Sequence, residues 1–209
     1  MEETSGWTTR RRLLGGVIGA GTVALAGCLS GDDDSSDDEE PSDAESPRSG
    51  IRSRAELVAV SDHPIDEPAP FEDDHACPVC GMPPASYRIW NGQIAHADGT
   101  GLFFDTPGCL LAYLVLPDEH ATDEAVETIW FTDFETQDIF EVDDGYLVEE
   151  TDMGRHSFPM GGSPIPFEAR DDAEAYVEEH DLHDDAVRTI DDVDRDFAEF
   201  YRGNRMPDE

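Results

Sequence analysis

CPVCGM, at residues 77–82, is followed at residues 101–114 by GLFFDTPGCLLAYL, and these two stretches predict the centre of the fold. The second stretch begins as a short apolar strand and continues as a helix. Thr106 is a favoured N-cap and Pro107 fits the first helical position, so the helix is predicted to begin there. Because the helix carries Cys109, a third cysteine follows the first two near a helix N-terminus.

Short strands and helices alternate along the rest of the chain, which indicates an α+β fold of small antiparallel hairpins packed with helices. Asn91-Gly92 is typical of a two-residue hairpin turn and is predicted to join strands at Ser86–Trp90 and Gln93–His96. The other predicted elements are a strand at Arg52–Val60, a loop at Asp62–Asp74, strands at Ile129–Phe134 and Asp144–Val148, a helix at Asp171–His180, a short strand at Ala186–Ile190 and a last helix at Val193–Tyr201. The predicted inward side chains of the last two helices are Ala173, Tyr176 and Val177, then Phe197 with Phe200 or Tyr201.

The N-terminus reads as an export signal rather than as part of the fold. Arginines at positions 10–12 precede an uncharged stretch that is too short to span a bilayer, which fits a twin-arginine signal over residues 1–27. LAGC at residues 25–28 resembles a lipobox, so Cys28 is predicted to carry a lipid; the alternative is an ordinary signal peptide with a chance cysteine. The protein would then be attached to the cell membrane by its lipid and face away from the cytoplasm.

Beyond Cys28 the chain divides into a tether and a domain. Residues 28–50 are acidic and contain too few apolar side chains to fold, so they are predicted to be an extended tether. Residues 51–205 are predicted to form the folded domain. This domain could consist of two subdomains, at about 75–120 and 125–202.

The charge of the chain is strongly negative, with a formal net value of −37 and no lysine. Because the acidic residues are spread along the whole chain, we interpret them as an adaptation of the surface to high salt, as in a halophilic host, rather than as a site for a cationic partner. Nucleic acid is excluded as a partner, since phosphate binding needs a basic surface.

The spacing of Cys77, Cys80 and Met82 fits three devices: half of a zinc knuckle, a redox pair, or a Cu(I) site that uses Cys80 and Met82. Gly81 permits a positive φ, so backbone amides could point toward the sulfurs. Cys77 and Cys80 could also form an inert disulfide. Cys109 could supply a third thiolate or be a small buried hydrophobic residue. A fourth zinc ligand is absent from the start of the helix, and the nearby candidates are His75 and His96.

A second sulfur lies in FPMGG at residues 158–162. Met160 stands between a proline and two glycines, which indicates a loop rather than a regular apolar face. Such a loop can hold a thioether close to another loop. His156 is nearby and could ligate or guard a metal, or could be an ordinary exposed histidine.

These motifs in combination resemble the NosL family of copper-chaperone lipoproteins of the nitrous oxide reductase system. The similar segments cover roughly residues 75–195: CPVCGM at 77–82, CLLAYL at 109–114, SFPMG at 157–161, PFE at 166–168 and AEAY at 173–176. The resemblance implies one Cu(I) bound through a cysteine and methionines, with Cys80, Met82 and Met160 as candidate ligands, and transfer toward an exported copper reductase. The first half also resembles treble-clef metal-binding modules of the TRASH type, and the second half is predicted to be of the ββα kind.

The sequence therefore predicts an exported, lipid-anchored Cu(I) chaperone and no catalytic residues. Two alternatives remain open at this point. One is a thiol–disulfide oxidoreductase that uses Cys77 and Cys80, although this pair does not open a βα unit of the thioredoxin kind. The other is a structural zinc module that mediates protein contacts.

Overall fold

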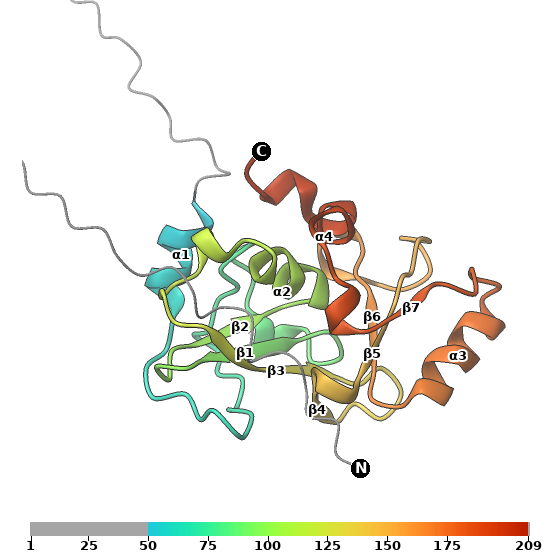
Figure 1. Ribbon diagram of the computed structural model, residues 1–209, viewed down its shortest axis with the longest axis horizontal. Coiled ribbons are helices and arrows are strands. Elements are labelled where there is room, and N and C mark those ends of the chain that lie inside the picture. The colour runs from blue at the N-terminus through green and yellow to red at the C-terminus, as the bar shows by residue number, and fades with distance from the viewer. Residues whose placement is uncertain (1–49, 209) are drawn as a thin grey trace, which may run out of the picture. The chain divides into compact units, whose positions relative to one another are not determined.

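The computed structural model of the protein describes residues 50–208 (Figure 1). The predicted export signal, Cys28 and the tether up to residue 49 lie outside these residues. Within them, no helix is long and apolar enough to cross a membrane. Four α-helices and two small antiparallel sheets make up the described part, so the α+β prediction is confirmed.

The first sheet has the strand order β2-β1-β3-β4. Its strands are β1 (Gly92–His96), β2 (Gly101–Phe104), β3 (Val126–Thr132) and β4 (Ile139–Glu141). Ile94 in the middle strand stands opposite Leu102 on one side and Ile129 on the other, and all three side chains are buried. These cross-strand apolar pairs fix the register, because a shift by one residue would turn them away from the core.

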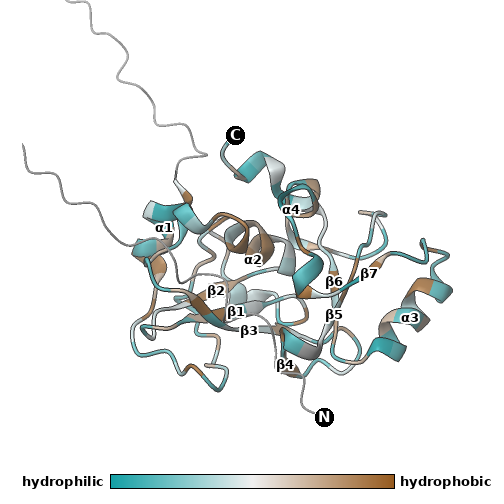
Figure 2. Ribbon diagram, in the orientation of Figure 1, coloured by the Kyte–Doolittle hydropathy of each residue, from teal (hydrophilic) through white to brown (hydrophobic). Residues whose placement is uncertain are grey.

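Helix α2 (Pro107–Leu114) lies between this sheet and helix α4 (Arg195–Arg202). Residues 107–113 are all buried, because α2 contacts β1 and β2 on one side and α4 on the other. Figure 2 shows the apolar character of α2, whereas α4 is mixed along its length. Thr106 caps α2 by accepting a hydrogen bond from the backbone N–H of Cys109, as predicted.

The second sheet has the strand order β6-β5-β7 and is packed against helix α3. Its strands are β5 (Tyr146–Val148), β6 (Ile165–Phe167) and β7 (Val187–Arg188), and α3 spans Arg170–Glu179. The predicted inward residues of α3 are confirmed as buried: Ala173, Tyr176 and Val177. In α4, Phe197 and Tyr201 are buried and Phe200 is 49% exposed, which selects Tyr201 from the two predicted alternatives.

The predicted strand at Arg52–Val60 is wrong, because Ile51–Val58 forms helix α1. Ile51 and Ala55 lie one helical turn apart and are both buried, so they form a single inward stripe. Only Val60 keeps extended pairing, as an isolated antiparallel bridge to Gly101.

The predicted hairpin turn at Asn91-Gly92 is also wrong. The hairpin joins β1 to β2 through residues 97–100, where Gly99 has a φ of 80°. Asn91 is instead buried, and its side chain contacts the Pro84 carbonyl and the Thr132 hydroxyl. Gly92 is required for packing, because a Cβ there would meet Phe131 Cδ1 and the Trp130 carbonyl oxygen at 2.9 Å.

Candidate metal centre

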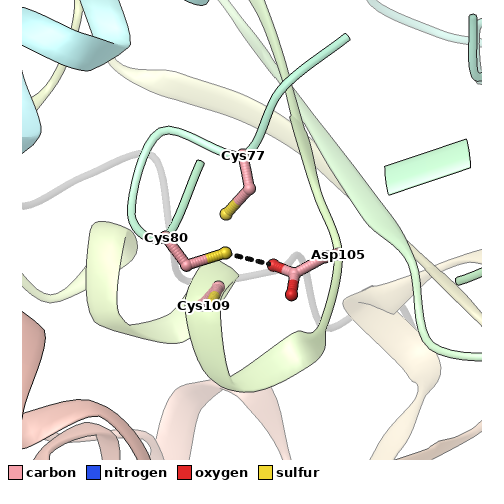
Figure 3. A group of neighbouring side chains, drawn as sticks. All are labelled: Cys77, Cys80, Asp105 and Cys109. Carbon is pink, nitrogen blue, oxygen red and sulfur yellow. Dashed lines mark hydrogen bonds between the residues drawn. The ribbon is translucent and has the colours of Figure 1, made fainter. Parts of the chain in front are cut away.

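Three thiols and one carboxylate converge at the start of α2 (Figure 3). One ligand atom from each of Cys77, Cys80, Asp105 and Cys109 lies within 4.8 Å of every other. We call these four residues the thiol cluster. Among the described residues, Cys77, Cys80 and Cys109 are free thiols rather than a disulfide pair and a spare cysteine. Cys77, Asp105 and Cys109 are buried, whereas Cys80 is only half-buried.

The loop of residues 77–82 is folded so that its first two cysteines face inward. The Gly81 N–H donates to the Cys77 carbonyl at 2.8 Å, and the Cys77 N–H donates to the Met82 carbonyl at 2.9 Å. Gly81 has a φ of 81°, as the sequence predicts for a residue that turns the chain here. The Met82 N–H then points at Cys80 Sγ, 3.5 Å away, so a backbone amide does face a sulfur.

Asp105 joins the cluster because β2 ends at Phe104 and the chain turns directly into the capped start of α2. The Cys80 thiol donates to Asp105 Oδ1 at 3.1 Å. The other carboxylate oxygen, Oδ2, is buried and has no hydrogen-bond partner among the described residues. Buried polar atoms are nearly always paired, so a free carboxylate oxygen among three sulfurs fits a ligand for a metal ion.

Arg202, at the end of α4, holds the far side of the cluster. Its Nε donates to Cys109 Sγ at 3.0 Å, although the two residues are 93 positions apart in the chain. Its Nη2 donates to Thr106 Oγ1 and its Nη1 to the Gly162 carbonyl, each at 2.8 Å. Arg202 is 1% exposed. A cation therefore lies against the sulfur at the N-terminus of α2.

The three cysteines have different protonation tendencies. Burial would raise the pKa of Cys109, but hydrogen bonds from Cys77 and Cys80 and the charge of Arg202 outweigh it and lower the pKa well below the usual range. The pKa of Cys77 is raised by burial and by its hydrogen bond to Cys109. The pKa of Cys80 is raised chiefly by its hydrogen bond to Cys109. The surroundings therefore favour the thiolate form at Cys109 and the protonated form at Cys77 and Cys80.

Asp105 also departs from its usual protonation. Burial raises the pKa of its carboxyl to about 6, and the negative charge of Cys109 acts in the same direction. Near neutral pH the carboxyl is therefore partly protonated. A bound cation would favour the charged carboxylate, so metal binding would displace this proton and let the oxygen act as a ligand.

The two methionines predicted as ligands lie on different loops. Met82 is half-buried and follows Cys80 directly after Gly81. Met160 is half-buried, has a φ of 60°, and packs against the same apolar core as Cys80. The left-handed backbone at Met160 is unusual for a residue with a side chain and costs about 1–2 kcal/mol. Their roles as ligands stay predictions.

The histidines considered from the sequence are not members of the thiol cluster. His156 Nε2 is 2.6 Å from the Tyr176 hydroxyl, and its ring packs with Trp90 and Phe158 beside the second sheet. The ring of His75 stacks on Phe103 with centroids 3.8 Å apart. The buried His96 contacts the Tyr113 hydroxyl. Asp105 instead offers the fourth possible ligand atom, and its signal in the sequence was its place just before Thr106, the N-cap of the helix that carries Cys109.

Comparisons with known proteins identify a family and a similar fold. The family model of NosL matches residues 68–198, more than half of the chain. A solved structure similar to this chain is the crystal structure of the copper chaperone NosL from Shewanella denitrificans, with a TM-score of 0.52 and 16% sequence identity, covering 64% of this chain and 99% of that chain. At this identity the likeness concerns the fold alone. The search of the curated proteins finds no match.

Proposed function

Because the chain belongs to the NosL family, we propose that it is a Cu(I)-binding chaperone that works outside the cytoplasm and is not an enzyme. The observation that carries the proposal is the convergence of three free thiols at the start of α2. Thiolate and thioether sulfur are the ligands that Cu(I) prefers over harder ions. The similar solved structure is described as that of a copper chaperone, which supports the same assignment.

Cys80 is the sulfur through which copper would enter and leave. It is the half-buried member of the cluster, whereas Cys77 and Cys109 are fully buried. Met82 and Met160 would add thioethers at the exposed side, in keeping with their half-buried positions. An incoming thiol or imidazole of an acceptor could then share the ion with Cys80 before the chaperone sulfurs release it.

The acceptor and the location extend this proposal beyond the described residues. We infer that the acceptor is an exported copper enzyme, by resemblance nitrous oxide reductase, and that a lipid on Cys28 keeps the chaperone at the membrane. Cys28→Ser should release an unlipidated protein from the membrane fraction. Retention and processing identical to those of the parent would refute the lipid anchor.

A structural zinc site is the second candidate function, because Asp105 completes a four-ligand set of three sulfurs and one oxygen. Zn²⁺ in structural sites has four such ligands. The redox alternative is less well supported: a reactive cysteine needs a lowered pKa and exposure, whereas the half-buried Cys80 has a raised pKa.

Metal titration separates these functions. The reduced protein is titrated with Cu(I) in competition with a Cu(I) chelator, and separately with Zn²⁺, at multimolar KCl. We expect one tightly bound Cu(I) per chain, abolished by Cys80→Ser. Tight binding of one Zn²⁺ that is unaffected by Met82→Leu and Met160→Leu, with no competitive Cu(I) binding, would establish the zinc module instead.

A further inference from the structure

Arg202 is a buried cation without a carboxylate partner among the described residues. Its hydrogen bonds go to Cys109 Sγ, the Thr106 hydroxyl and the carbonyls of Gly162 and Tyr201. Removing a guanidinium from water is strongly unfavourable unless an opposite charge compensates it. Of these four partners, only the sulfur can become an anion, so the compensating charge must come from the thiol cluster.

Metal binding adds negative charge at the same place. Cysteines bind metals as thiolates, so a monovalent ion held by two thiolates leaves one excess negative charge, and three thiolates leave two. In a buried site such an excess is unfavourable unless a cation is close. Arg202 Nε is 3.0 Å from Cys109 Sγ and is therefore placed to balance this charge.

The same guanidinium also connects two segments of the site. Its contact with Thr106 reaches the cap of α2, and its contact with Gly162 reaches the loop that carries Met160 two residues earlier. Gly162 itself is closely packed, because a Cβ there would overlap Met153 Sδ. The planar fork of arginine can hold several acceptors at once in a fixed geometry, which lysine cannot do.

We propose that Arg202 is a positioning residue of the thiol cluster, which supplies the counter-charge for the metal-bound cysteines and fastens the Met160 loop to the start of α2. This inference rests on the proposed Cu(I) binding. The family model matches residues 68–198, and Arg202 lies beyond them. The residue that would support the thiol cluster therefore comes from a segment outside the family match.

The test is a double-mutant cycle between Arg202 and Cys109, measured as Cu(I) affinity in chelator competition at multimolar KCl. Arg202→Gln should weaken Cu(I) binding by about tenfold or more, the scale of a lost charge-assisted contact. In a Cys109→Ser background the same change should have an effect of less than about twofold. Arg170→Gln is the matched control: it removes one positive charge from an exposed pair with Glu174 on α3 and should leave affinity unchanged.

Two further readouts separate positioning from general stability. Arg202→Lys keeps the charge but not the fork, so it should bind Cu(I) more tightly than Arg202→Gln by about threefold or more. X-ray absorption should give fewer copper–sulfur contacts in Arg202→Gln than in the parent, whereas a purely structural role would leave the sulfur count unchanged. Thermal melting of the metal-free variants shows whether each is folded.

Each outcome decides the inference. Equal affinity of the parent and Arg202→Gln, or an equal loss in both Cys109 backgrounds, overturns the positioning role while leaving the proposed function intact. A parent that binds no Cu(I) refutes the proposed function itself. If Arg202→Gln does not fold, Arg202→Lys takes its place in the cycle. Arg202→Lys must then lower the Cu(I) affinity of the parent without lowering that of Cys109→Ser. Equal losses of affinity in the two backgrounds would again overturn the inference.

Discussion

Met160 adopts a left-handed backbone conformation, with φ 60° and ψ 14°, although glycines follow it immediately. Backbone strain at a residue with a side chain persists when the surroundings require it, and it is common at ligand sites. We therefore expect the Met160 side chain to have a role at the metal site, through its sulfur.

Met160→Leu tests this role because leucine conserves volume and apolar character while removing the thioether. We expect weaker Cu(I) binding and the loss of one copper–sulfur contribution in X-ray absorption. The melting temperature of the metal-free protein should change little. If the variant binds copper like the parent with the same sulfur count, the ion is held by the thiol cluster and the Cys77–Met82 loop alone.

Asp105 predicts a pH dependence of stability in the metal-free protein. Its folded pKa of about 6 lies above the ordinary value of 3.8, so the folded state binds the proton more tightly than the unfolded state. The contribution of Asp105 to the free energy of unfolding is therefore greatest below about pH 4. It is lost as the pH rises through 6, by about 2–3 kcal/mol in total.

Asp105→Asn should remove this dependence, because an amide does not titrate. Denaturant unfolding at pH 4.5 and pH 7 would measure it. At pH 7 the variant should be more stable than the metal-free parent. A parent and variant with parallel pH profiles would show that Asp105 does not titrate in this range.

At the scale of secondary structure, short-range signals were sufficient where they were strong. The N-cap and proline at the start of α2 gave its beginning, and the inward residues of α3 followed from helical spacing. Helix α1 was missed because its two buried residues, Ile51 and Ala55, form too short a stripe to reveal a period. Strand β4 was missed because three residues, with Ile139 40% exposed, carry no alternation that can be recognised.

The hairpin prediction failed for a different reason. Asn91-Gly92 has the composition of a turn, but tertiary contacts of Asn91 with Pro84 and Thr132 use it to lead the chain into β1. Gly92 is then enclosed by β3 rather than exposed at a turn.

Gly92→Ala should accordingly destabilise the fold by about 1–3 kcal/mol, since the added methyl group meets backbone as well as a ring. Gly203→Ala is the control: its Cβ would have only an ordinary contact at 3.7 Å with Glu199, so its effect should stay within about 0.5 kcal/mol. Thermal or denaturant unfolding measures both. If Gly92→Ala changed stability no more than Gly203→Ala does, Gly92 would not be closely packed against β3.

For the molecule as a whole, the sequence indicated that Cys77, Cys80 and Cys109 could belong to one metal site, but it indicated only part of what surrounds them. The cysteines share a recognisable spacing, whereas Asp105 and Arg202 are joined to them by contacts that depend on the completed fold. The contact of Arg202 with Cys109 spans 93 residues, and no local pattern indicates it.

The net charge of −37 predicts that the folded state depends on salt. Like charges destabilise a compact chain, and multimolar KCl reduces their range to about 3 Å or less. Dilution to about 0.1 M, where screening extends to about 10 Å, should cause partial unfolding seen by circular dichroism. A spectrum and melting temperature that do not change on dilution would argue against adaptation to high salt.

The long separation between Arg202 and Cys109 also sets an order of events during synthesis. Contacts distant in sequence form late, because the chain must first close a large loop. A nascent chain that has not yet produced α4 has the three cysteines of the thiol cluster but lacks the Arg202 guanidinium that contacts Cys109. In such a chain the thiol cluster lacks its Arg202 contact until α4 docks, so the cluster is complete only after most of the chain has been made.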